Sequence, residues 1–216
     1  GFRKSIEMGI VHASNNKLVV FGLTPSEPES GYGYIESEEP LKEKNLEFSK
    51  INKFIEKPNN KLAKELIKDK RYLWNSGIFL FKAKTILKEI EKFSPDIVKF
   101  CSESIKERES DFDFQRIDKV SFNKCPNISI DYAVMEKTKL GTVVFLKTGW
   151  SDLGTWNALW NNSKKNSKGN FTQGNIILRN SKNCFVKGEN RLIVGLGLNN
   201  IIAIETRDAI LITDQN

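Results

Sequence analysis

The sequence predicts an α/β protein, in which a sheet is covered by helices and followed by a tail of short strands. Three observations predict it. Segments with the patterns of strands and helices alternate along residues 1–160, as they do when helices pack on a sheet. Residues 161–172 are polar and low in complexity, as linkers are. Beyond them, along residues 173–216, short apolar runs recur between turn residues and predict short stacked strands.

The first elements follow from the spacing of apolar residues. Residues 2–14 have the periodicity of an amphipathic helix, which two asparagines end. A buried strand is expected at 17–22. A loop with two prolines at 24–30 then leads into a glycine turn at 31–34. Residues 46–56 alternate as a strand, and a nearby proline ends it.

The middle of the chain alternates between helix and strand. We expect a lysine-rich helix at 60–70, a strand at 73–81 and a helix at 83–93. A further helix opens at Pro95 and runs toward Glu109, and its many charges predict a solvated face.

Three elements complete the first region. Residues 129–137 have the S-x-D pattern of a helix start, with Ser129 as the candidate cap. Residues 140–146 form a continuous apolar run and predict a buried strand. A helix begins near Thr155.

Composition excludes several classes of protein. The net charge of +7 comes mostly from lysines that are spread evenly among glutamates, so the chain has no basic stripe for a nucleic acid. The three cysteines are far apart in sequence and predict reduced core thiols rather than a disulfide framework or a zinc site. His12 lies near the end of the first helix, where the helix dipole explains it. No apolar run predicts a membrane span or a signal peptide, so a cytoplasmic location is expected.

Five motifs together resemble one enzyme family. They are GYGYIE at 31–36, FIEKP at 54–58, WNSGIFLF at 74–81, SIDYAVMEKT at 129–138 and WSDLGTW at 150–156. In this order and at these separations they resemble the sugar-1-phosphate nucleotidyltransferases, most closely the mannose-1-phosphate guanylyltransferase branch. The resemblance is close over residues 2–160 and looser over the tail.

The resemblance implies a Rossmann-like mixed sheet with flanking helices, and a tail that forms a small β-helix-like unit. Family members open with a glycine-rich nucleotide loop, GGxGxRLxPL, and carry a first metal-binding aspartate after it. This sequence contains neither. We therefore expect the chain to be the later part of a longer enzyme and to be inactive alone. An isomerase domain after residue 216 would fit a bifunctional enzyme.

Asp152 is the candidate metal ligand, between a glycine turn and two tryptophans. A carboxylate is a hard oxygen ligand suited to Mg²⁺, which takes its other ligands from substrate phosphates and water. The alternative is structural: Asp152 or Ser151 caps the helix that begins near Thr155.

The other candidate residues come from the motifs that the family uses for the sugar phosphate. Lys57 would reach the phosphate as a point charge, or else form a surface pair with Glu56. By resemblance, Glu56 accepts hydrogen bonds from sugar hydroxyls, and Gly33 contacts the sugar. Asn75 has an amide that both donates and accepts, or stabilises a turn beside Ser76 and Gly77. Asp131 contacts ligand or caps a helix; both interpretations stay open.

The resemblance implies transfer of a guanylyl group from GTP to mannose 1-phosphate with Mg²⁺, giving GDP-mannose and pyrophosphate. No proton acceptor is needed, because a phosphate monoester is already mostly a dianion at neutral pH. Two alternatives remain. One is a sugar nucleotidyltransferase that uses UTP or dTTP, and the other is a non-catalytic scaffold that binds sugar phosphates. A homodimer stays open.

Overall fold

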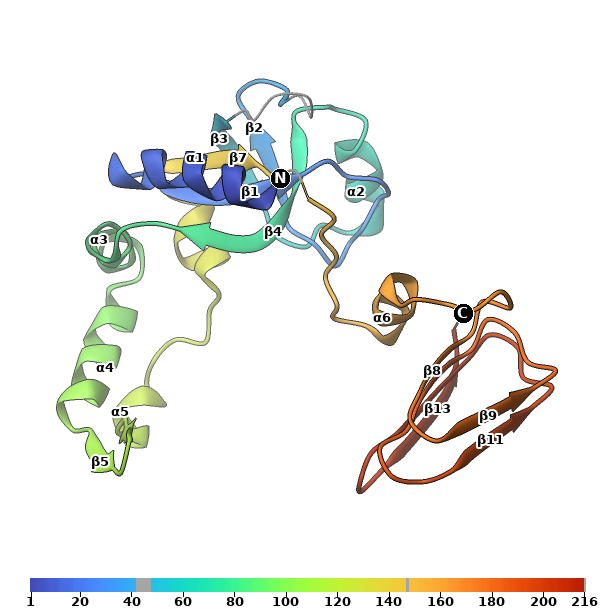
Figure 1. Ribbon diagram of the computed structural model, residues 1–216. Helices are drawn as coiled ribbons and strands as arrows, with labels where there is room; N and C mark the ends of the chain where they lie inside the picture. Colours follow the sequence, from blue (N-terminus) through green and yellow to red (C-terminus); the bar gives the residue numbers. More distant parts are fainter. Residues whose placement is uncertain (42–47, 147, 216) are drawn as a thin grey trace. The chain divides into compact units, whose positions relative to one another are not determined.

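The computed structural model describes residues 1–41, 48–146 and 148–215. The chain divides into two compact units, Gly1–Gly149 and Trp150–Asn216 (Figure 1). The predicted α/β class is confirmed, whereas the predicted boundaries at residues 160 and 172 stay a prediction. Among the described residues, none of the helices has the length and apolar content of a membrane span.

The elements of the first unit follow the expected alternation. In chain order they are α1 (Phe2–Ser14), β1 (Leu18–Leu23), β2 (Tyr34–Ser37), β3 (Phe48–Ile55), α2 (Asn60–Leu66), β4 (Tyr72–Leu80), α3 (Ala83–Phe93), α4 (Pro95–Lys106), β5 (Glu109–Asp111), β6 (Phe114–Arg116), α5 (Lys119–Phe122), η1 (Asp131–Met135) and β7 (Gly141–Phe145).

Five strands close into a barrel in the order β1-β4-β2-β3-β7. β1 and β7 pair in parallel, and the other four pairings are antiparallel, so the sheet is mixed. All residues of β1 and β7 are buried. A strand buried on both faces is a continuous apolar run in sequence, which is why the sequence predicts these two strands so closely.

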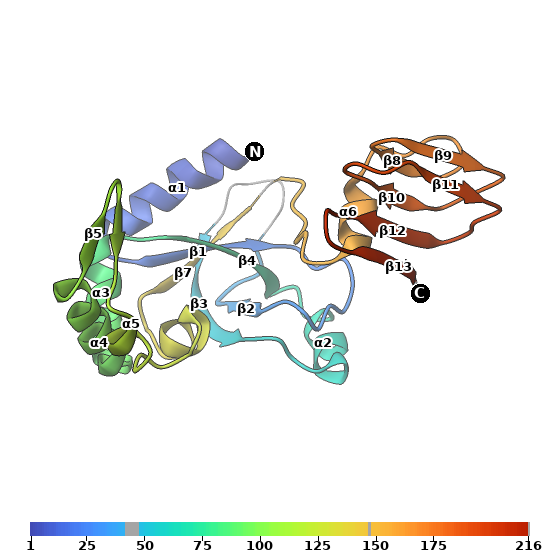
Figure 2. The ribbon, with the colours of Figure 1, turned by 90° about the horizontal axis from the view of Figure 1, so that it is seen from below.

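Helix α1 packs on β1, β4 and β7. The hydroxyl of Ser5 donates to the carbonyl oxygen of Phe145 at 3.0 Å. A Cβ on Gly9 would lie 2.9 Å from the Phe21 ring, so glycine at this position lets the helix approach the strand closely. Helix α3 packs against the barrel core through Ile86 and Ile90, and in Figure 1 α4 and α5 extend away from the barrel. Figure 2 shows the three helices gathered at one end of the barrel. We call residues 83–125 the arm.

The structure differs from the predicted elements in four places. Strand β2 was not predicted, because only a glycine turn was expected at 31–34. The helix expected at 60–70 ends at Leu66. The α-helix expected at 129–137 is instead a short π-helix, η1. The hairpin of β5 and β6, and the short α5, were not predicted. The strand expected at 46–56 is β3, and the start of that range lies outside the described residues.

The second unit contains one helix and six strands within its described residues. They are α6 (Trp156–Asn162), β8 (Phe171–Gln173), β9 (Ile176–Arg179), β10 (Phe185–Lys187), β11 (Ile193–Leu196), β12 (Ile201–Glu205) and β13 (Ile210–Asp214). β8, β10 and β12 pair in parallel, as do β9 and β11, whereas β13 runs antiparallel to β12. Parallel pairing of strands close in sequence requires the chain to wind in coils.

Alternate residues at the start of β10, counted from Cys184 directly before it, pack on opposite sides of the sheet. Cys184 and Val186 belong to the core between the sheets, while Phe185 packs with Leu159 and Trp160 of α6.

The second unit also contains a buried charged group. The Glu205 side chain is 1% exposed, and its carboxylate accepts from two backbone N–H groups and from Arg191 at 3.0 Å.

Candidate functional site

Five of the six predicted site residues lie in the first unit, and the structure brings them together. Glu56 and Lys57 follow the end of β3, Asn75 lies inside β4, Asp131 begins η1, and Gly33 directly precedes β2. We call these five residues the polar cluster. It forms because β2 pairs with both β3 and β4, which sets Gly33 beside residues from two neighbouring strands.

Gly33 leaves room for a carboxylate. A Cβ at this position would lie 2.6 Å from Oε2 of Glu56, closer than unbonded atoms can approach. The carbonyl oxygen of Gly33 accepts from the backbone N–H of Asn75 at 2.8 Å. Gly33 thus leaves space for the Glu56 carboxylate and forms a backbone hydrogen bond with Asn75.

Lys57 has a left-handed backbone, with a φ of +44°. In a regular strand Glu56 and Lys57 would point to opposite faces, but β3 has ended at Ile55. Their charged groups are therefore on one side, with Nζ of Lys57 3.6 Å from Oε1 of Glu56. The Glu56 side chain is 10% exposed and that of Lys57 is 64% exposed. The carboxylate is fixed in the cluster, while the ammonium group extends into solvent.

Asn75 lies in the interior of β4, rather than at its start as the strand prediction implied. The register between β1 and β4 shifts beside it. Its amide oxygen accepts from the N–H of Gly77 at 3.0 Å, and Gly77 has a φ of +70°. Its amide nitrogen donates to Oδ1 of Asp131 at 3.3 Å. Asn75 therefore stabilises a local bend, as the structural alternative held, and also orients Asp131.

Asp131 is the first residue of η1, and the N-cap position before it belongs to Ile130. Its side chain accepts from Asn75. In η1 the N–H of Glu136 donates to the carbonyl oxygen of Asp131 at 3.0 Å. A π-helix is rare and is often found at functional sites.

Glu136 is a neighbour of the cluster that sequence reasoning did not single out. Its Oε1 accepts from the backbone N–H of Glu56 at 3.4 Å. The sequence showed Glu136 only as the continuation of a helix. The π-helical backbone that places it could not be distinguished from an α-helix by apolar spacing in so short a segment.

The cluster holds more acidic than basic groups, and this shifts their pKa values. Burial raises the pKa of Glu56 above its usual range; Asp131 also raises it, while Lys57 lowers it. Burial likewise raises the pKa of Asp131, against hydrogen bonds from its own backbone, Ser129 and Asn75. Burial has removed water from these carboxylates, and the hydrogen bonds that they accept from the protein do not fully compensate for it. A ligand with several hydroxyl groups would supply the donors.

The aromatic residues near the cluster pack. Tyr34 is fully buried, and its hydroxyl donates to the carbonyl oxygen of Glu29 at 2.9 Å. Trp74 packs in the same core cluster, with its ring edge-on to that of Tyr32 at a centroid distance of 5.1 Å. We assign these rings no contact with a ligand.

Asp152 belongs to the second unit, so it is not among the residues grouped above. Its side chain is exposed. The residue that caps α6 is Thr155, whose hydroxyl accepts from the N–H of Ala158 at 3.1 Å. Ser151 accepts instead from the side chain of Asn162 at 2.8 Å. The helix-capping interpretation of Asp152 and Ser151 is therefore wrong. Among the described residues, no three His, Cys, Asp or Glu side chains are grouped as metal ligands.

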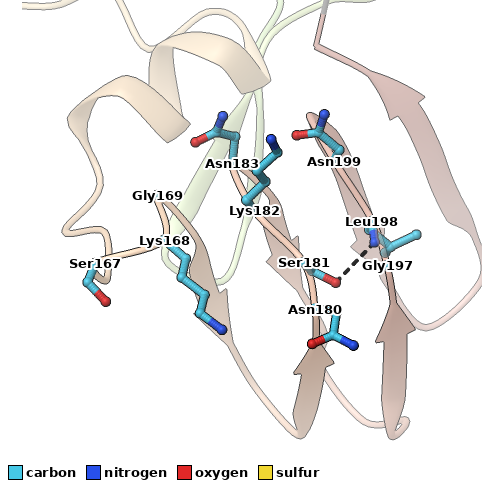
Figure 3. A pocket seen from close by; sticks show the side chains of 10 residues that line it. All are labelled: Ser167, Lys168, Gly169, Asn180, Ser181, Lys182, Asn183, Gly197, Leu198 and Asn199. Atoms are coloured by element: carbon cyan, nitrogen blue, oxygen red, sulfur yellow. Dashed lines mark hydrogen bonds between the residues drawn. The ribbon is translucent and has the colours of Figure 1, made fainter.

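A groove of about 600 Å³ lies at one corner of the coils in the second unit. Figure 3 shows its polar lining, in which Ser181 accepts from the N–H of Leu198 at 3.1 Å. Asn180 and Asn183 have left-handed backbones here, as chain corners require. The side chain of Asn183 donates to that of Asn200 at 3.3 Å. These asparagines hold the corners of the coils.

Comparison with known proteins supports the division of the chain into two parts of different kinds. A family model described as nucleotidyl transferase matches residues 2–169. A second model, described as the MannoseP isomerase/GMP-like beta-helix domain, matches residues 174–216. The predicted β-helix-like tail is confirmed.

Relatives extend the similarity over the whole chain. A mannose-1-phosphate guanylyltransferase of Salmonella montevideo is 42% identical over 218 residues, which cover 100% of this chain and 46% of the relative. One from Escherichia coli is 40% identical over 213 residues, or 98% of this chain and 46% of the relative. This chain thus spans about half the length of these curated relatives.

A solved structure shares the fold. It is described as mannose-1-phosphate geranyltransferase from Thermus thermophilus, with a TM-score of 0.79 and 25% identity. The match covers 99% of this chain and 60% of the other.

Proposed function

Because this chain belongs to the nucleotidyl transferase family, we propose that the protein containing it transfers a guanylyl group from GTP to mannose 1-phosphate. The products are GDP-mannose and pyrophosphate. The observation that carries the proposal is the polar cluster, in which two desolvated carboxylates and an amide lie beside a protruding ammonium group. The names of both relatives favour the guanylyl group and mannose 1-phosphate over other nucleotides and sugars.

In this proposal the cluster binds the sugar phosphate. Glu56 and Asp131 accept hydrogen bonds from sugar hydroxyls, which lowers the cost of keeping both carboxylates charged. The Asn75 amide holds Asp131 in place. Gly33 keeps the space open at the Glu56 carboxylate.

Lys57 has the electrostatic role. Its ammonium group lies 3.6 Å from Oε1 of Glu56 on a side chain that is 64% exposed. In this proposal it pairs with the phosphate of the sugar. The phosphate oxygen that attacks GTP is already ionised at neutral pH. Catalysis then depends on holding two anions in line and on neutralising their charge.

We propose Mg²⁺ as the metal and Asp152 as one of its ligands. Among the described residues, the Asp152 carboxylate has no hydrogen-bond or ion-pair partner, and Thr155 performs the capping that would otherwise occupy it. A free, exposed carboxylate fits a metal that takes most of its ligands from phosphates and water. When bound, Mg²⁺ would neutralise negative charge on the reacting phosphates.

Pyrophosphate release tests the proposal. The protein containing this chain is incubated with Mg²⁺, mannose 1-phosphate and GTP, UTP or dTTP in turn. We expect the largest kcat/KM with GTP. A preference for UTP or dTTP would replace the guanylyl assignment with another nucleotide. Binding of mannose 1-phosphate without release from any triphosphate would favour the non-catalytic scaffold.

A further inference from the structure

Two cysteines that are far apart in sequence meet in the structure. Cys101 lies on α4, and Cys125 follows the end of α5. Their Sγ atoms are 3.9 Å apart. Both residues are partly buried, whereas Cys184 is fully buried in the second unit. All three cysteines are free thiols, as the sequence predicts, but only Cys184 lies in a core.

We propose that Cys101 and Cys125 form a reversible disulfide when the protein meets a small-molecule disulfide such as oxidised glutathione. The S–S bond is about 2.05 Å long, so the two sulfurs need to approach by about 1.9 Å. Rotation about χ1 of either cysteine moves its Sγ while the backbone stays in place.

The local backbone already holds the two thiols together. The N–H of Asp118, at the start of α5, donates to the carbonyl oxygen of Ser104 on α4 at 3.0 Å. The N–H of Cys125 donates to the carbonyl oxygen of Phe122 at 2.9 Å. The thiol pair therefore lies between two segments that are docked without it, and the disulfide forms within the folded arm.

The reaction is an exchange of disulfides. One thiolate attacks a sulfur of oxidised glutathione, forms a mixed disulfide and releases one glutathione thiolate. The second thiolate then attacks the protein sulfur of the mixed disulfide and releases the other glutathione. The two cysteine sulfurs lose two electrons and two protons, and oxidised glutathione is reduced to two molecules of glutathione.

The disulfide would close a loop that contains residues 102–124. Between the two cysteines lie the β5–β6 hairpin and α5, with exposed side chains that include Phe112, Phe114 and Val120. The crosslink restricts this segment in the unfolded chain. Reduction of the disulfide removes this restriction. The cysteine pair is therefore a redox modification site.

The test exposes the protein containing this chain to oxidised glutathione, blocks free thiols with an alkylating reagent and maps unreduced peptides by mass spectrometry. Burial and Cys101 raise the pKa of the Cys125 thiol, so the reaction is followed over hours. We expect a peptide that joins Cys101 to Cys125 within one molecule and disappears with dithiothreitol. The unfolding midpoint of the oxidised protein should rise by roughly 5 to 10 °C.

Three variants give the test its controls. Cys101→Ser and Cys125→Ser should each abolish both the joined peptide and the rise in midpoint. Cys184→Ala should retain both, because that thiol lies in the other unit. Alkylated Cys101 and Cys125 after exposure to the oxidant would overturn the proposal. Lasting mixed disulfides with glutathione, or a crosslink between two molecules, would also overturn it.

Discussion

Gly33 and the carboxylate of Glu56 share one small space: a Cβ on residue 33 would lie 2.6 Å from Oε2 of Glu56 and 3.3 Å from Cβ of Asn75. Residue 33 has no left-handed backbone that would itself require glycine. What requires glycine here is the volume that the carboxylate occupies. The position of the Glu56 carboxylate, which follows β3, therefore depends on the residue that precedes β2.

Gly33→Ala should displace the Glu56 carboxylate and raise KM for mannose 1-phosphate about tenfold, since a charged hydrogen bond is worth roughly 1.5 kcal/mol or more. Steady-state kinetics measure this. The matched control is Gly31→Ala, whose added methyl would meet its nearest atom, Oε1 of Glu29, at 3.4 Å. Equal effects of the two substitutions would remove Gly33 from the site.

Lys57→Gly should separate activity from stability. The substitution removes the ammonium group, worth roughly 1.5 to 3 kcal/mol when it pairs with a phosphate, so KM for mannose 1-phosphate should rise about 10- to 100-fold. It also removes the strain of a left-handed lysine backbone, which costs about 1 kcal/mol. The free energy of unfolding should therefore not fall.

The control for Lys57→Gly is Lys53→Gly in the exposed interior of β3, where glycine should cost about 0.5 to 1 kcal/mol of stability. Its KM should stay unchanged. An unchanged KM in Lys57→Gly would return Lys57 to a surface ion pair with Glu56.

Asp152→Asn and Thr155→Ala should have opposite effects. Asp152→Asn should remove most of the metal-dependent turnover, because the amide keeps the size of the side chain but lacks the negative charge that Mg²⁺ prefers. Its stability should stay within about 0.5 kcal/mol of the parent. Thr155→Ala should keep turnover and lose about 1 kcal/mol, because α6 loses its cap. Turnover is measured at increasing Mg²⁺ concentrations, and stability is measured by urea unfolding. Full activity of Asp152→Asn would exclude Asp152 as a ligand.

Glu56→Gln should reveal a carboxyl that destabilises the fold when it is charged. Because the pKa of Glu56 is raised in the folded state, its contribution to stability is complete below the ordinary glutamate pKa and is lost as pH rises through the raised value. The stability of Glu56→Gln relative to the parent should thus increase with pH, in urea unfolding between about pH 4 and pH 8.

Glu205→Gln should show the opposite pH dependence of stability. Backbone N–H groups, that of Asn190 first, lower the pKa of Glu205, so its stabilising effect appears above that lowered pKa and is lost as pH falls through it. This variant should therefore lose stability relative to the parent as pH rises from acid to neutral. The same pH trend in both variants would contradict the raised pKa of Glu56.

Much of the fold could be predicted from the sequence because burial leaves a pattern. β1 and β7 are buried on both faces and appear as apolar runs. Helix α3 begins and ends at the predicted residues, because its apolar residues recur at helical spacing. The β5–β6 hairpin is short and its residues are mostly exposed, so apolar spacing contained no signal for it.

The residues of the candidate site could be predicted only from the sequence motifs. The sequence named Gly33, Glu56, Lys57, Asn75 and Asp131, but their grouping depends on pairing between distant strands. The left-handed backbone at Lys57 could not be read from a lysine. The alternative role of Asp152 or Ser151 as a helix cap was wrong because Ser151, Asp152 and Thr155 are all acceptable caps. Only the backbone at the start of α6 decides among them.

The reversal of direction at β13 covers one edge of the parallel stack in the second unit. β8, β10 and β12 add to one another in the same direction, and a stack built in this way could in principle grow by one coil after another. β13 pairs with β12 in the opposite direction, so the outer edge of β12 is already occupied and a further parallel strand cannot add to it. Growth of the parallel stack at this edge is therefore stopped by a strand of the unit itself.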